Sequence, residues 1–272
     1  MSPPLPTQSG ESPARPRGYD LGLLLLRGAA ALVLVTWGWG KFTALMHALN
    51  SGPPLGSWHF VQIIGQVGFP FPTFMAVCAV LNESLVATLL VLGIFMRPAA
   101  LIAALGMIGA LYASICWNNE LLRAALCALI FAALALLGAG RYSLGHVLWP
   151  GREDPTQTSA DLGLVLLRTG AAVASVSLAI IPLVKAPNLA VASPANWWLI
   201  VAGVGSVLAA LGLKIRPVSA ALTGFWLFTS LAGLYAGFAW SVFPIRAALF
   251  AIIYGALALT GPGRRSASPA QS

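Results

Sequence analysis

The chain alternates between long apolar stretches and short polar breaks. Crossing the hydrocarbon core of a bilayer takes about 20 apolar residues in a helix. Helices are expected because lipid offers no partner for backbone N–H and C=O groups, so each segment must satisfy its own. The pattern predicts an all-α integral membrane protein with eight spans, at about 20–40, 73–96, 98–116, 120–138, 161–182, 196–213, 217–239 and 243–261.

Short breaks rich in glycine and proline separate these stretches. Arg97-Pro98 and Arg216-Pro217 connect neighbouring stretches, and proline suits a helix start because its missing N–H is not needed there. The segment from Ser57 to Pro72 is apolar but too short and broken to span, so we expect it to lie in the outer interface as a lid. The clearest polar linker runs from Gly140 to Ala160.

The two halves of the chain share similar segments in the same order. Residues 20–35 (DLGLLLLRGAAALVLV) and 161–176 (DLGLVLLRTGAAVASV) are identical at ten of sixteen positions. Residues 117–143 and 240–266 are identical at fifteen of twenty-seven positions. Between them, Gly93 with Arg97-Pro98 matches Gly212 with Arg216-Pro217. Because collinear self-similarity is the signature of a repeat architecture, we predict a tandem duplication of a four-helix unit.

The predicted duplication divides the chain into units. An even number of spans in each unit makes both copies cross the membrane in the same direction, as in parallel-repeat membrane proteins. We therefore expect two parallel-repeat four-helix bundles. The ends are rich in Pro and Ser and are expected to be disordered. The expected division is a cytoplasmic tail at 1–18, a four-helix unit at 19–148, a linker at 149–160, a degenerate four-helix unit at 161–261 and a cytoplasmic tail at 262–272.

Composition and charge support a membrane protein. Apolar residues make up 58% of the chain and charged residues 8%, whereas a soluble domain carries about 25% charged residues. A net charge of +8 would suggest a nucleic-acid partner in a soluble protein, but here the basic residues lie at the ends of apolar stretches. We interpret them as topology signals. Nine fall on one side and four on the other, which favours a bacterial-type inner membrane with both termini in the cytoplasm.

Glu83 is the acidic residue that falls deep inside an apolar stretch, roughly 15 Å from its start near Thr73. Ionisable groups at such depth usually face an interior partner or a site. Two interpretations stay open: a proton relay that also binds a quinone or substrate oxygen, or a bridge that locks two helices. Arg27 lies about six residues into the first stretch. We expect it either to pair with Glu83, or to extend back to the inner headgroups or have another structural role.

Lys41 follows Gly38-Trp39-Gly40 at the outer end of the first stretch. It is expected either to anchor the outer interface or to hold an anionic headgroup or sulfur oxyanion. In the second half, Pro182 replaces Lys41 and Ala202 replaces Glu83, whereas Arg168 matches Arg27. We therefore expect the first half to contain any site and the second half to be mainly scaffold.

The tryptophans gather on the predicted outer side. Aromatic belts normally mark both interfaces, so the excess indicates either belt anchoring or a pocket for a flat ring. In the second interpretation the cofactor-binding candidates are Trp37, Trp39, Trp58 and Trp117. No metal or haem site is expected, because no His/Cys/carboxylate cluster is present and His47, His59 and His146 lie outside the spans. No nucleotide-binding fingerprint is present either.

Four segments of the first half together resemble the DoxX family of small four-helix membrane proteins. They are D-L-G-x-x-L-L-R from Asp20, G-W-G-K-F from Gly38, N-E-x-L-x-A-x-L-L-V-L-G-x-x-x-R from Asn82, and G-x-G-R-Y-S-L from Gly138. Some relatives are similar to the small subunits of thiosulfate:quinone oxidoreductase, and others are linked to thiol or quinone redox stress. The resemblance implies a quinone as cofactor, a soluble or peripheral oxidoreductase partner beside the membrane lipid, and Glu83, Arg27 and Lys41 as catalytic candidates.

Three functions remain open from the sequence. The first is a component of a quinone-linked redox system that acts on a small sulfur or thiol compound. The second is a membrane scaffold or assembly subunit without catalysis, which suits the loss of the Glu83 and Lys41 equivalents in the second half. The third is a small-molecule permease, which the small number of polar residues in the spans disfavours.

Overall fold

The computed structural model describes residues 17–52, 54–116, 121–150, 155–185, 194–235 and 243–261. Over these residues the regular structure is helical and no strand is present. The elements are α1 (Arg17–Ser51), η1 (Leu55–Ser57), α2 (His59–Gln66), α3 (Pro72–Leu81), η2 (Asn82–Val86), α4 (Ala87–Leu92), α5 (Met96–Cys116), α6 (Leu121–Leu137), α7 (Leu144–Leu148), α8 (Gln157–Lys185), α10 (Pro194–Ala210), α11 (Ile215–Tyr235) and α12 (Phe243–Thr260).

The prediction of an all-α membrane protein is confirmed. Within the described part of the chain, five segments are long and apolar enough to cross a membrane, at 17–50, 72–92, 96–116, 158–178 and 215–235. The remaining predicted spans coincide with shorter apolar helices at 124–137, 199–210 and 247–260. The total of eight spans therefore stays a prediction.

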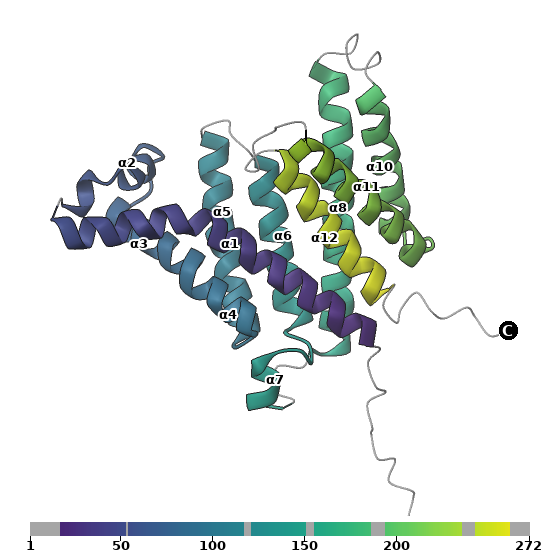
Figure 1. Ribbon diagram of the computed structural model, residues 1–272, viewed down its shortest axis with the longest axis horizontal. Coiled ribbons are helices and arrows are strands. Elements are labelled where there is room, and N and C mark those ends of the chain that lie inside the picture. The colour runs from purple at the N-terminus through teal and green to yellow at the C-terminus, as the bar shows by residue number, and fades with distance from the viewer. Residues whose placement is uncertain are drawn as a thin grey trace, which may run out of the picture.

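Helix α1 is the longest element, and it crosses the bundle obliquely. In Figure 1 it runs diagonally in front of the more upright helices α5 and α6, and its far end lies beside α2 and α3. Its first half packs against α12 and α6, and its second half packs against η2 and α4. One helix therefore connects the second half of the chain with the region where the first half holds its buried acid.

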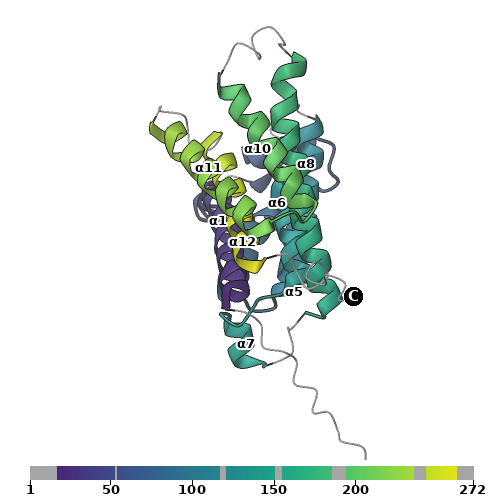
Figure 2. The same cartoon turned by 90° about the vertical axis from the view of Figure 1, so that its right-hand side faces the viewer.

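The two halves form one packed body with matching contacts. Helix α1 packs on α3, η2 and α4 as α8 packs on α10, and α5 pairs with α6 as α11 pairs with α12. Between the halves, α6 contacts α8 and α1 contacts α12 (Figure 2). One continuous apolar core includes residues of all these elements except α3. The halves therefore do not form two loosely joined bundles.

The turns before α5 and α11 have the same backbone geometry. Gly93 and Gly212 both have positive φ, 66° and 83°. In each turn the glycine N–H donates to the carbonyl three residues back, and the next N–H donates to the carbonyl five residues back. This is the Schellman arrangement that closes a helix C-terminus. Two residues after each glycine, Phe95 and Lys214 also have positive φ. Such equivalent turns are what the predicted duplication requires.

Arg27 binds main-chain carbonyl groups, and its predicted pairing with Glu83 is wrong. Its Nη1 donates to the carbonyl oxygen of Ala139 at 3.0 Å, and its Nη2 donates to that of Tyr142 at 2.5 Å. The residue is 2% exposed, so it does not extend into the headgroups either. A Cβ on Gly93 would collide with its Nη1. Arg27 thus ties α1 to the chain after α6 and to the turn before α5.

Helices α1 and η2 approach each other closely at Gly38. A Cβ built on Gly38 would lie 2.6 Å from the Cβ of Glu83 and 3.3 Å from its backbone oxygen. Gly40, two positions beyond on the same helix, has nothing within 4 Å of its Cβ position. Glycine at position 38 therefore sets the distance between the two helices, while Gly40 only weakens the helix.

We predict that Gly38→Ala destabilises the protein by about 1–3 kcal/mol, because the extra methyl group forces the helices apart. The matched variant Gly40→Ala is expected to be neutral or up to about 1 kcal/mol more stable, since alanine is the better helix former. Thermal unfolding in mild detergent, followed by circular dichroism, measures both. Equal effects of the two substitutions would contradict the close approach at Gly38.

We also predict that Arg27→Met destabilises the protein by about 2–3 kcal/mol, because two buried carbonyl groups lose a charged donor. The control is Arg141→Met, whose side chain is 52% exposed and lies 3.9 Å from Asp20. Asp20 is buried, but it also accepts from the backbone N–H of Arg141, which the substitution keeps, so loss of this long, half-exposed ion pair should cost at most about 1 kcal/mol. The same unfolding measurement checks both variants. An Arg27→Met protein as stable as Arg141→Met would argue against the structural role.

Candidate functional site

A π-helical turn interrupts the second predicted span at its only described acidic residue. The turn η2 lies between α3 and α4, and Asn82 and Glu83 are its first two residues. Both are buried, at 9% and 6% exposure. Single π-helical turns inside α-helices frequently mark functional sites. This turn directs two consecutive polar side chains into the protein, one toward α1 and the other toward α5.

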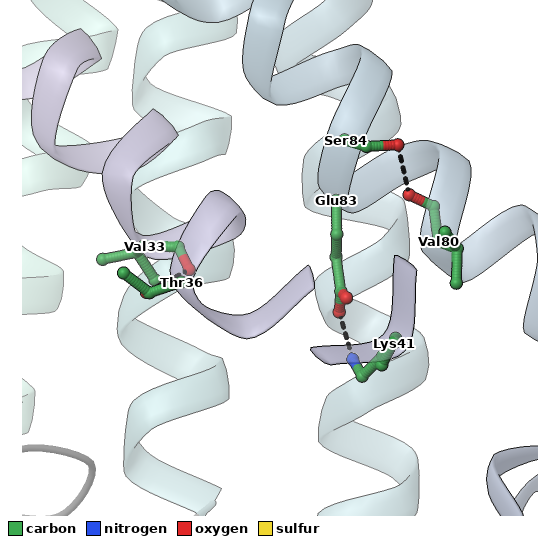
Figure 3. Close-up of polar contacts among 6 residues, drawn as sticks. All are labelled: Val33, Thr36, Lys41, Val80, Glu83 and Ser84. Carbon is green, nitrogen blue, oxygen red and sulfur yellow. Dashed lines mark hydrogen bonds and ion pairs between the residues drawn. The ribbon is translucent and has the colours of Figure 1, made fainter. Parts of the chain in front are cut away.

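Glu83 forms an ion pair with Lys41. Figure 3 shows the Glu83 side chain extending from η2 to Lys41 on α1, where Lys41 Nζ donates to Oε1 of Glu83. The Glu83 side chain is 8% exposed and that of Lys41 is 29% exposed. The other carboxylate oxygen of Glu83, Oε2, is buried and has no hydrogen-bond partner. The hydrogen-bonding capacity of the Glu83 carboxylate is therefore only partly used, and its unpartnered Oε2 lies inside the protein.

The partner of Glu83 is Lys41 and not the predicted Arg27, and the reason is geometric. The sequence estimate of depth treats each helix as perpendicular to the membrane, which puts Lys41 at the outer surface and Glu83 at the centre. Helix α1 is oblique (Figure 1), so a residue near its far end meets the middle of η2. Lys41 therefore does more than anchor the interface, and its pairing with Glu83 means that it is not free to bind an anion.

Aromatic rings of the segment before α3 cover the ion pair. Lys41 Nζ lies 4.8 Å from the ring centroid of Phe60, which is on α2. Trp58, just before α2, has its ring 5.3 Å from that of Phe60. Val61 and Ile64 of α2 pack on Ala76 of α3. The segment predicted as a lid is therefore a short helix that lies over Lys41. Its Phe60 ring offers an aromatic face that attracts the lysine cation.

The predicted tryptophans do not all gather at this site. Trp58 lies beside Phe60, and Trp37 is partly buried against the core, one helical turn before Lys41. Trp39 is 65% exposed and contacts Phe42, so it faces away from the buried pair. Two residues apart on a helix point to nearly opposite sides, which explains why Trp39 and Lys41 separate. Trp117 lies outside the described residues.

Asn82 and Gly106 are parts of the site that sequence reasoning missed. A Cβ on Gly106 of α5 would fall on Nδ2 of Asn82, so only glycine leaves room for this amide. Asn82 Oδ1 is buried and has no hydrogen-bond partner. The signal available in the sequence was the pair Asn82-Glu83 in an apolar span, together with Gly106 in the next span.

The arrangement can hold and move a proton next to a hydrogen-bond donor. Lys41 has three N–H donors, of which Glu83 accepts one. Glu83 Oε2 and Asn82 Oδ1 present acceptors inside the protein. The ring of Phe60 shields the pair on the α2 side. A ligand with carbonyl or hydroxyl oxygens next to a flat apolar body matches these groups chemically.

Comparison with protein families gives one match. Residues 22–114 match the family described as DoxX. The matched region includes α1 from its sixth residue through most of α5, and therefore Arg27, Lys41 and Glu83. No curated protein and no solved structure is significantly similar to the chain. Residues 22–114 therefore contain a DoxX domain, and DoxX is a redox-related family of membrane proteins.

Proposed function

We propose that the first half of the chain is the quinone-binding part of a membrane redox system that acts on a small sulfur or thiol compound. The observation that supports this proposal best is the buried Lys41–Glu83 pair, whose second carboxylate oxygen has no partner. Buried polar groups in proteins nearly always have partners. An unpartnered carboxylate oxygen beside a lysine and an aromatic ring is therefore a group kept for a ligand.

The residues present fit the headgroup of a quinone. Lys41 has N–H donors beyond the one given to Glu83, and these can bind a ring carbonyl. Phe60 and Trp58 supply aromatic faces on the same side. A bound quinone would supply a two-electron, two-proton acceptor. In this proposal Lys41 binds and orients the ring oxygen, Glu83 transfers a proton at Oε2, and α2 keeps water away.

The donor side of the reaction is assigned to a partner. Oxidation of two thiols to a disulfide releases two electrons and two protons, which balances the uptake by one quinone. We assign this oxidation to a soluble or peripheral oxidoreductase subunit, as the family resemblance implies. The side of α1 that carries Lys41 then needs only to bind the acceptor and pass protons.

A second candidate function rests on the same ion pair. Lys41 and Glu83 link α1 to η2, so they also suit a membrane scaffold in which the pair locks two helices. Breaking a buried pair on one side is strongly destabilising, whereas replacing both partners with apolar residues is often neutral. The two functions therefore respond differently to the same double substitution.

We predict that Glu83→Gln lowers the quinone content of the purified protein and weakens binding of the reduced quinol about 10–100-fold, because the contact from the quinol O–H to the Glu83 carboxylate, about 1.5–3 kcal/mol, loses its charge. Quinone is extracted from protein in mild detergent and quantified per chain. The matched control is Ser84→Ala, since the Ser84 hydroxyl binds only the carbonyl of Val80 on its own helix. Quinone at the level of a lipid-matched control protein would contradict the proposal.

The double variant Lys41→Met with Glu83→Leu separates the two functions. It restores apolar packing between α1 and η2, so a scaffold should keep its stability and its partners. A quinone site should lose its quinone while the protein still folds. Stability, quinone content and partner pull-down from one preparation give the answer.

We propose further that both termini lie in the cytoplasm of a bacterial-type inner membrane. The start of α1 and the end of α12 lie near each other at the same end of the bundle (Figure 1), which supports termini on one side. A fluorescent protein fused after Ser272 is expected to fluoresce, and alkaline phosphatase at the same place to be inactive. A phosphatase fusion after Gly52 should be active. The opposite pattern would reverse the proposed orientation.

A further inference from the structure

The interior of the second half contains polar side chains on every one of its main helices. Each is buried: Ser219, Trp226 and Ser230 on α11 are 0%, 2% and 6% exposed. The others are on the three remaining main helices of the second half. They are Ser175 on α8, Ser206 on α10 and Tyr254 on α12, at 1%, 0% and 0% exposure.

The aligned positions of the first half are buried and apolar. The alignment follows the identical segments and the shared turn glycines, and the first-half residues are all at most 3% exposed. Burial is thus the same in both halves, but the second half has polar groups where the first has none. The aligned pairs are Leu34 with Ser175, Ala87 with Ser206, Ala100 with Ser219, Met107 with Trp226 and Phe131 with Tyr254.

Aromatic rings stack beside these polar groups. The ring of Trp226 lies 4.5 Å from that of Phe250 at an interplanar angle of 18°. The ring of Phe250 lies 6.5 Å from that of Tyr254 at 13°. The hydroxyl of Tyr254 and that of Ser175 are 3.2 Å apart. The stack therefore joins α11, α12 and α8 into one aromatic and hydroxyl-bearing cluster.

Two buried polar atoms on α11 have no partner: one belongs to this cluster, and the other is seven residues before it on the same face of the helix. Hydroxyls in the spans commonly donate to a carbonyl four residues back, as Ser206 does to Ala202 at 2.6 Å. Ser219 Oγ and Trp226 Nε1 are buried and make no hydrogen bond. An unpaired buried polar group costs about 1–3 kcal/mol, and packing alone is satisfied by the apolar residues of the first half. Stability therefore does not explain these polar side chains.

We propose that the second half binds a small uncharged molecule, with a flat ring and carbonyl-type hydrogen-bond acceptors, at Trp226, Ser219 and Tyr254. The indole N–H is a donor only, so the ligand must offer an acceptor. The nearest arginine along α8, Arg168, is seven residues from Ser175, or roughly 10 Å. Along α11, Arg216 is ten residues from Trp226, or roughly 15 Å. Arg216 lies three residues before Ser219, so only the Trp226 end of the site is far from a cation along α11; an uncharged ligand is favoured because it must reach the site through lipid.

The position of α11 provides a route for such a ligand. Its outward residues Leu227, Phe228 and Leu231 are 49%, 72% and 60% exposed, so this face borders lipid. Trp226 itself is 2% exposed, and binding therefore requires a local movement of α11 against α12. An uncharged flat molecule dissolved in the bilayer can enter along this face, whereas a sulfur oxyanion cannot.

The test uses coumarin, a flat uncharged molecule with two acceptor oxygens and no redox chemistry at this site. Its binding to the full-length protein in detergent is measured by equilibrium dialysis against empty micelles. Trp226→Phe and Ser219→Ala are each expected to weaken binding about 3–10-fold, since each removes one neutral hydrogen bond. The controls are Trp149→Phe, an exposed tryptophan, and Ser114→Ala, whose hydroxyl binds the carbonyl of Ala110. Both should bind coumarin as the wild type does.

A stability measurement distinguishes a ligand group from a structural one. Without coumarin, Ser219→Ala should raise the unfolding midpoint by about 2–4 °C, because it removes an unpaired buried hydroxyl. A lowered midpoint would show that the hydroxyl supports the fold and would overturn the proposal. So would the absence of saturable coumarin binding, or equal binding by Trp226→Phe, Ser219→Ala and the controls. Trp226→Phe and Ser219→Ala should weaken coumarin binding in a Glu83→Gln background as they do in the wild type, which separates this site from the proposed quinone site.

Discussion

The structure depends on one constraint: inside a bilayer no water is available to satisfy polar groups, so each needs a partner within the protein. Arg27 meets this need for two carbonyl groups after α6. Serine and threonine hydroxyls meet their own need by bonding back along the helix, as Ser84, Thr223 and Thr260 do. The turns at Gly93 and Gly212 close helix ends through their own N–H groups. Against this background, an unpartnered buried polar atom is informative.

Apart from the Nε atoms of Arg27 and Arg168, two groups of such atoms lie in different halves of the described chain. In the first half they are Glu83 Oε2 and Asn82 Oδ1, beside a lysine and a phenylalanine ring. In the second half they are Ser219 Oγ and Trp226 Nε1, beside a stack of rings. A buried ion pair is weak evidence for stability, because desolvation offsets most of its attraction. The chemistry of both clusters is therefore better explained by ligands than by folding.

The sequence predicted the helices well, since apolar length and glycine–proline breaks directly reflect the needs of a chain in lipid. It also singled out Glu83, because an acid in an apolar span is costly wherever the neighbours lie. It did not predict that Lys41 is the partner. That contact depends on the oblique course of α1, on Gly38 and on the π-helical turn, and none of these follows from hydrophobic periodicity. Nor did it predict the contacts of Arg27, because backbone carbonyl groups are present at every residue and leave no mark in the sequence.

The contrast between the halves follows from which residues the framework needs. The arginine, the turn glycine and the Arg-Pro pair occur in both halves, and in both the arginine lies near the turn glycine, with Arg168 Nη1 4.0 Å from the Cβ position of Gly212. Arg27 satisfies backbone carbonyl groups, and the turn glycines of both halves close helix ends through their N–H groups, so a copy of the unit that folds in lipid is expected to keep this framework. Glu83 and Lys41 satisfy no such backbone need, and the second half has lost both. Trp226 and Ser219 are the opposite case. The first half folds with Met107 and Ala100 at the aligned positions, so folding does not require a tryptophan and a serine there. If the halves arose by duplication, both copies kept the residues of the framework, while each copy has its own cluster of polar groups. A substitution that removes either cluster should therefore leave the packing of the helices intact.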